Sequence, residues 1–200
     1  MQAAIEAFTA SMRRARSLHG LHDIFSKQVT EVIDLSDILR AVIVLAVSAL
    51  DHYVHELARL GMLECVAGTR KCTDAFNRFP LPISVIAGLR DTVIAEQTID
   101  AEIRSRHGYL AFQHPDRIAD AVRLFSEVKL WDEVGNRLGL ASKDIKASLA
   151  LIIERRNKIA HEADIDPSYP GQRWPIDSEM VESTLSTLEA IAHAIFVVVG

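Results

Sequence analysis

The sequence predicts an all-α protein, a single helical bundle of four to six helices spanning residues 1–200. Three observations support this prediction. Long segments repeat apolar residues at steps of three and four, which is the period of an amphipathic helix. Glycine and proline are sparse, at 9 and 6 of 200 residues, so few breakers interrupt these segments. No internal repeat, low-complexity tract or long linker divides the chain into separate domains.

The first predicted helix runs from Gln2 to about Lys27. Apolar residues recur along one face of it, at Ile5, Phe8, Met12, Ala15 and Leu18. A stripe of this kind is typical of a helix that packs its apolar face against the rest of a bundle.

The second predicted helix is the most apolar part of the chain. It begins with a cap at Ser36 or Asp34 and runs to about Glu64 without a breaker. Its first half includes the run AVIVLAVSAL (Ala41–Leu50), is apolar nearly all round, and therefore predicts a central helix. β-branched residues would also suit a strand, but the length and the helical period favour a helix. This run has ten residues, below the roughly 20 needed to cross a bilayer. The apolar tail IAHAIFVVVG is also too short, so we expect no membrane anchor.

Breakers and caps locate the remaining elements. Residues 65–82 are the least regular part, and a proline at 115 suits the first turn of a helix. The expected helices lie within residues 84–106, 113–140, 142–163 and 176–199. A loop rich in proline and turn formers, DIDPSYPGQRWP, separates the last two.

Composition limits the classes of function. A net charge of −5 argues against a broadly basic protein that coats nucleic acid, although a small local basic site remains compatible with it. Cys65 and Cys72 form neither a metal-ligand pattern nor a disulfide framework. The N-terminus lacks the apolar segment of a signal peptide. We therefore expect a reduced, cytoplasmic protein.

The predicted helix over residues 142–163 carries the candidate site. Its apolar stripe consists of Ile145, Leu149, Ile152, Ile159 and Ala163. Arg156 falls on this stripe, whereas Arg155 falls on the polar side and is expected to be a surface charge. Lys158 can pair with Glu154 and Glu162 at i,i+4, for about 0.2–0.5 kcal/mol each.

Asn157 and His161 are four residues apart and flank the apolar stripe near Arg156. A guanidinium, a carboxamide and an imidazole therefore converge at the edge of an apolar surface, where unpartnered polar groups cost several kcal/mol. One interpretation is structural, with an internal hydrogen-bond network or cations at a helix C-terminus. The other is a site for a phosphodiester. Arginine can contact the phosphate, asparagine can orient it, and histidine can move protons near neutral pH.

The segment RNKIAH (Arg156–His161) resembles the Arg-x(4–6)-His motif of the HEPN (higher eukaryotes and prokaryotes nucleotide-binding) superfamily, in its Arg-Asn-x-x-x-His form. Four segments are similar to the RiboL-PSP-type branch and occur in the expected order: DLSDILRAVIVLAVSALDHYVHEL, FQHPDRIADAV, LW and ERRNKIAHEAD. The resemblance runs from about Asp34 to the C-terminus. The motif alone arises often by chance, so its specificity comes from the all-α context and from these segments.

The resemblance implies a bundle that dimerises and brings two motifs together in a cleft. It implies a metal-independent endoribonuclease without a cofactor, of a kind found in toxin–antitoxin, antiphage and RNA-processing systems. His161 would then move protons during attack by the ribose 2′-hydroxyl, Arg156 would stabilise the phosphate charge, and Asn157 would hold one of them in register. The implied partners are RNA, a second copy of the chain, and an antitoxin or other regulatory protein.

Supporting or substrate-binding roles are expected for Asp51, His55, Arg155, Lys158 and Glu162. The segment DHYVHE (Asp51–Glu56) has too few converging ligands for a metal site and suits a structural role, although Asp51 and His55 could reach the His161 region. A second function also stays open. The chain could be a non-catalytic helical module that binds RNA or a nucleotide, or that scaffolds a partner protein. Motif groups that are hydrogen-bonded internally and closed to solvent would favour it.

Overall fold

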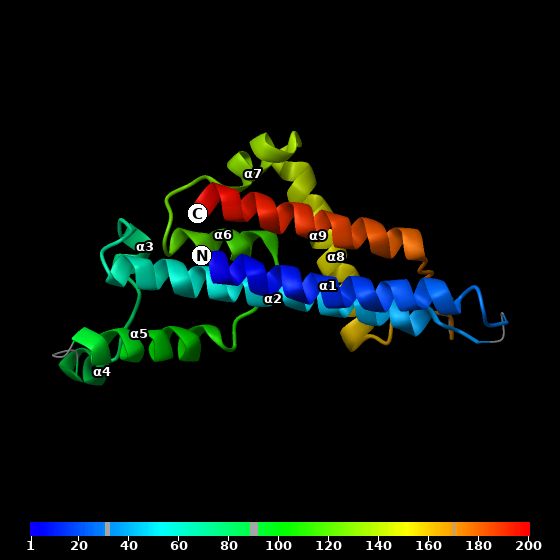
Figure 1. Ribbon diagram of the computed structural model, residues 1–200, viewed down its shortest axis with the longest axis horizontal. Helices are drawn as coiled ribbons and strands as arrows, with labels where there is room; N and C mark the ends of the chain where they lie inside the picture. Colours follow the sequence, from blue (N-terminus) through cyan, green and yellow to red (C-terminus); the bar gives the residue numbers. More distant parts are fainter. Residues whose placement is uncertain (31–32, 89–91, 170) are drawn as a thin grey trace.

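The computed structural model describes residues 1–30, 33–88, 92–169 and 171–200, and these residues form an all-α bundle (Figure 1). The described helices are α1 (Gln2–Phe25), α2 (Ser36–Val66), α3 (Asp74–Asn77), α4 (Ile83–Gly88), α5 (Thr92–His107), α6 (Pro115–Arg123), α7 (Leu130–Leu138), α8 (Ser142–His161) and α9 (Ser178–Val199). Within these residues, the backbones of Ile165 and Arg173 also form an isolated antiparallel β-bridge.

Three long helices, α1, α2 and α9, lie side by side and enclose the centre of the core (Figure 1). α2 contributes fully buried residues along its whole length, as its continuous apolar pattern predicts. Tyr53 of α2 packs its ring 5.4 Å from that of Phe8 in α1 and donates a hydrogen bond to the carbonyl of Ala192 in α9 at 3.2 Å. One buried side chain thus links all three helices.

An ion-pair network also joins the first and last helices. The guanidinium of Arg16 in α1 donates to Glu182 at 2.8 Å and to Glu189 at 2.7 Å, both in α9. These hydrogen bonds raise the pKa of Arg16 far above its usual value, those to Glu189 most strongly. The termini of the chain are therefore held in one bundle, with α1 and α9 both against α2.

The helix α5 lies along the opposite flank of α2 (Figure 1). Ion pairs join the two, from Arg59 to Asp100 at 3.0 Å and from Arg104 to Glu56 at 3.2 Å. Beneath these charges, Ile103 and His107 are buried. This layer extends the bundle beyond its three long helices.

Among the described residues the helix count exceeds the predicted four to six, because one expected helix divides and a short helix forms in the segment expected to be irregular. The segment expected to be one helix from residue 115 ends at Arg123 and begins again at Leu130. α7 ends where Gly139 adopts φ 67°, a left-handed conformation that suits glycine. The expected helix over residues 84–106 corresponds to α4 and α5, and residues 89–91 between them lie outside the described residues. The irregular segment 65–82 contains the short helix α3.

Two helices, α2 and α9, are long and apolar enough by length and composition to cross a membrane. The ten-residue apolar run underestimates the apolar length of α2, because an 18-residue window of this helix reaches a mean hydropathy of 1.5. About half of each window is buried inside the bundle, at 56% and 44%. A buried core helix meets the same criteria, so the expectation of no membrane anchor stays a prediction.

Candidate active site

The helix α8 positions the Arg-Asn-x-x-x-His motif. Its buried residues Ile145, Leu149 and Ile153 recur at four-residue steps and pack into the core. α8 runs across the three long helices and not along them, so its C-terminal half emerges on the α5 side of α2 (Figure 1). The motif therefore stands at the edge of the bundle, where the apolar face of α8 ends.

Arg156 and Asn157 are half-buried, and their side chains bind each other. Nη1 of Arg156 donates to Oδ1 of Asn157 at 3.0 Å. The Nε atom of Arg156 is buried without a hydrogen-bond partner in the described part of the chain. Arg156 thus lies at the margin of the apolar stripe, as the helical period predicts, and Asn157 limits its orientation.

His161 is the last residue of α8 and is exposed. Within the described ranges, its ring makes no hydrogen bond or ion pair. The basic side chains Lys158 and His161 lie in the last turn, where the helix dipole favours positive charge. An imidazole in this position is accessible to a substrate.

Arg155 is not the surface charge that the helical period predicts. Its side chain is 18% exposed, and its Nη2 donates to Oδ2 of Asp164 at 2.9 Å. Burial lowers the pKa of Arg155, against the opposing effect of the Asp164 carboxylate, and the charge of Arg40 lowers it further. The polar side of α8 is covered here by the chain that follows it, so the period of the helix alone could not predict this contact.

Asp164 is the buried residue beside the motif that sequence reasoning missed. It is 0% exposed, and its carboxylate also accepts a hydrogen bond from Nε of Arg40 at 2.7 Å. Arg40 lies in the first turns of α2, 124 residues earlier in the chain. The only local signal was an acidic residue in a loop of turn formers, which is typical of an exposed loop.

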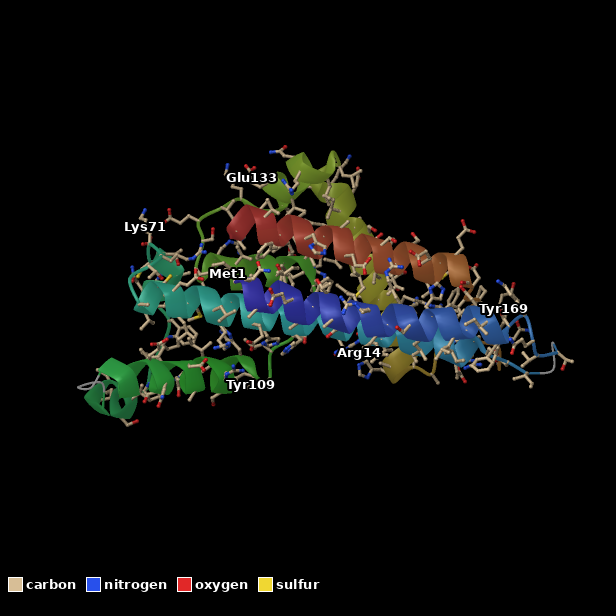
Figure 2. All side chains as sticks on the ribbon, viewed as in Figure 1. Met1, Arg14, Lys71, Tyr109, Glu133 and Tyr169 are labelled. Atoms are coloured by element: carbon tan, nitrogen blue, oxygen red, sulfur yellow. The ribbon has the colours of Figure 1, made fainter. Side chains whose placement is uncertain are left out.

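The loop from Asp164 to Trp174 folds back against α2 and α8. Arg173 pairs with Asp34 at 2.7 Å and with Asp37. The label of Tyr169 in Figure 2 places the loop at the end of the molecule where α2 begins. The loop thus covers the polar side of α8 next to the motif.

Two ion pairs were predicted for Lys158, and within the described residues the one with Glu162 does not form. Lys158 pairs with Glu154 at 2.9 Å, as expected, and its amine lies 5.0 Å from the centre of the Trp174 ring. Glu162 follows the helix with φ −119°, and no ion pair of its side chain occurs among the described residues. The helix ends one residue before Glu162, which is its C-cap.

Asp51 and His55 bind a different part of the molecule. Asp51 accepts a hydrogen bond from the backbone N–H of Phe112 at 2.6 Å, and His55 contacts the carbonyl of Leu110 at 3.2 Å. No hydrogen bond or ion pair joins either residue to His161 within the described chain. They connect α2 to the segment after α5, so the expected reach to His161 is not formed by direct contact.

Comparison with known protein families matches residues 12–198 to the family described as RiboL-PSP-HEPN. The searches of curated proteins and of solved structures found no match. The matched range contains α2 to α8 entirely and most of α1 and α9, and it includes the whole motif. Membership indicates a nuclease-type or RNA-related module. The chain therefore belongs to the RiboL-PSP-HEPN family.

Proposed function

We propose that this protein is a metal-independent endoribonuclease of HEPN type. The observation that supports it most is the arrangement at the end of α8, where Arg156 and Asn157 are bonded at 3.0 Å and an exposed His161 follows. Family membership supports an RNA-related role for the same residues. The exposure of His161 is unlike the closed, internally bonded motif that a purely structural role would favour.

The proposed reaction uses the ribose 2′-hydroxyl of the RNA itself. A base removes the hydroxyl proton as the 2′-oxygen attacks the adjacent phosphorus, and the bond from phosphorus to the 5′-oxygen breaks. An acid then supplies the proton that the leaving 5′-oxygen takes up. The products are a 2′,3′-cyclic phosphate and a free 5′-hydroxyl. DNA lacks the 2′-hydroxyl and is not cleaved.

In this proposal each motif group has one task. The guanidinium of Arg156 donates to the phosphate oxygens as their charge grows, and charge-assisted bonds of this kind strengthen towards the transition state. Asn157 holds Arg156 in orientation through its amide oxygen. His161 transfers the protons, which suits histidine because its side chain changes charge near neutral pH.

A second copy of the chain would complete the site. The reaction removes a proton from the 2′-hydroxyl and supplies one to the leaving 5′-oxygen on the opposite side of the phosphorus. Each chain offers one motif histidine for these two transfers. An apolar groove of about 330 Å³ beside the motif helix supports a protein contact there; Trp174 and Leu151 line it, and Leu151 is 66% exposed. Light scattering after size-exclusion chromatography is expected to give twice the chain mass of 22.2 kDa. A species of single-chain mass alone would contradict the composite site.

The first test is cleavage of end-labelled single-stranded and structured RNA in excess EDTA. Wild type is expected to cut, and His161→Ala and Arg156→Ala are expected to lose at least about a hundredfold in rate, the typical contribution of a general acid–base group. Controls are His193→Ala in α9 and Arg137→Ala in α7, which change exposed side chains of the same types. Circular dichroism checks that all four variants stay folded.

The cleaved ends identify the mechanism, since cyclic phosphate termini accompany 2′-hydroxyl attack. A wild type that cuts no RNA would refute the nuclease proposal, and a non-catalytic module that binds RNA, a nucleotide or a partner protein would then take its place. As a toxin or antiphage effector, the wild type would arrest growth on controlled expression and His161→Ala would not. Growth arrest by both proteins would exclude the nuclease as its cause.

A further inference from the structure

Asp164 joins two buried positive charges at the end of the motif helix. Its Oδ2 atom accepts hydrogen bonds from Arg40 at 2.7 Å and from Arg155 at 2.9 Å. The side chains of Arg40 and Asp164 are 8% and 1% exposed, and that of Arg155 is 18% exposed. Removing the carboxylate from such a group leaves both positive charges without their partner inside the protein, which is strongly destabilising. We call Arg40, Arg155 and Asp164 the clamp.

The backbone at the clamp has an unfavourable conformation. Ala163 and Asp164 both have positive φ angles, 52° and 59°. For a non-glycine residue the left-handed region is strained, because the Cβ atom comes too close to the following carbonyl oxygen. Two such residues in succession persist only where neighbouring contacts hold them. Here the N–H of Asp164 donates to the carbonyl of Lys158 at 3.0 Å, and the carbonyl of Asp164 accepts from the N–H of Trp174 at 2.9 Å.

The two arginines of the clamp also hold the far end of the loop. The carbonyl of Trp174 accepts from Nη2 of Arg40 at 2.9 Å and from Nη2 of Arg155 at 3.2 Å. Arg155 reaches the carbonyl of Pro175 as well, at 3.1 Å. The start of α2, the end of α8 and both ends of the loop therefore meet at a single carboxylate.

We propose that Asp164 is a positioning residue for the ribonuclease reaction, an inference that rests on the function proposed above. The clamp determines where α8 ends, and His161 is the final residue of that helix. Because Arg155 is held by Asp164, its neighbour Arg156 is left to face the substrate. A shift of about 1 Å in a reacting group can lower the rate by about a hundredfold, so loss of the clamp acts on kcat.

The test compares Asp164→Asn with Asp166→Asn. Asp166 is a matched control, since it is 7% exposed in the same loop, and its carboxylate accepts from the N–H of Ser168 at 2.9 Å without reaching Arg40 or Arg155. Asp164→Asn is expected to lower kcat by about ten- to a hundredfold with KM within about threefold. Asp166→Asn is expected to keep both constants near wild type. Equal losses in the two variants, or a loss confined to KM, would overturn the proposal.

A second variant, Arg155→Gln, addresses the risk that Asp164→Asn unfolds. It breaks the α8 side of the clamp and leaves Asp164 paired with Arg40. The readout for both variants is the NMR signal of the His161 ring, assigned by its disappearance in His161→Ala. A shifted ring signal in Arg155→Gln and an unchanged one in Asp166→Asn are expected. If wild type cuts no RNA but the signal shifts, the proposed function fails and the link from clamp to His161 stands. An unshifted signal in a folded Arg155→Gln would refute that link directly.

Discussion

His107 makes the stability of the bundle depend on pH. The side chain is 5% exposed at the end of α5, with its ring centre 5.2 Å from that of Phe112 and 6.5 Å from that of His55. Its Nδ1 atom is buried without a hydrogen-bond partner among the described residues. Burial, and to a smaller extent the charge of His55, lowers the pKa of His107 from 6.5 to about 4.

The direction of the pH effect on stability depends on whether the folded or the unfolded state binds the proton at the higher pH. The unfolded chain takes up a proton on this histidine near pH 6.5, whereas the folded protein resists it down to about pH 4. The stability is therefore intact above the unfolded pKa and is lost as the pH falls towards 4. With about 1.4 kcal/mol per pKa unit, the loss at pH 4 reaches about 3 kcal/mol.

Glu56 lines the same cleft as His107, and its pKa is also lowered. Burial of Glu56 favours its neutral form, but the hydrogen bond and charge of Arg59 and the charges of Arg104 and His52 outweigh this and lower its pKa. Its stabilising effect is present above the unfolded pKa and is lost as the pH falls through the depressed folded value. His107 therefore dominates the change between pH 6.5 and about 4.5.

The assay is urea unfolding, followed by circular dichroism at several pH values between 7 and 4. His107→Leu keeps the apolar contacts and removes the titrating ring, so its unfolding free energy is expected to fall by about 3 kcal/mol less than that of wild type over this range. His193→Leu, at an exposed position in α9, is the control and is expected to follow wild type. Parallel pH curves for wild type and His107→Leu would refute the reasoning.

Substitutions at three further positions test the packing and a helix end. A Cβ on Gly61 would lie 2.3 Å from the ring of Phe125, so Gly61→Ala is expected to destabilise by about 1–3 kcal/mol, whereas Gly20→Ala in α1 meets nothing within 4 Å and is expected to stabilise by about 0.5–1 kcal/mol. Thermal unfolding that shifts in the same direction for both would contradict this packing. Asp177 caps α9 by accepting from the N–H of Met180 at 2.7 Å, so Asp177→Ala is expected to cost about 1 kcal/mol in urea unfolding, and Asp177→Asn much less.

Hydrophobic period was sufficient to predict the fold class and the long helices. The predicted cap was Ser36 or Asp34; α2 begins at Ser36, whose N–H donates to Asp34 at 2.8 Å, while Leu35 occupies the N-cap position. Short connections were not predictable in the same way. The break between α6 and α7 depends on how Trp131 enters the core and donates to the carbonyl of Pro115 at 3.0 Å. This contact joins residues that are distant in the sequence, so no local sequence pattern predicts it.

At the candidate site, too, local features were predictable and tertiary contacts were not. Arg156 was distinguishable from Arg155 because one helical period decides which residues share a face. The partner of Arg155 could not be predicted, because Asp164 reaches Arg155 through a left-handed turn and Arg40 comes from another helix. The period could identify the residue that faces the core edge, but not the segment that would cover the opposite face.

The clamp also has a consequence for the evolution of this chain. Arg155 precedes the motif directly and Asp164 follows it after two intervening residues, which extends the pattern to Arg-Arg-Asn-x-x-x-His-x-x-Asp. Because the two buried arginines depend on one carboxylate, a change at Asp164 alone is expected to be disfavoured, and correlated changes are expected among relatives. Arg40 should join the same group, although it lies more than a hundred positions away in the chain. Relatives that lose the acidic residue are expected to carry neutral residues in place of both arginines.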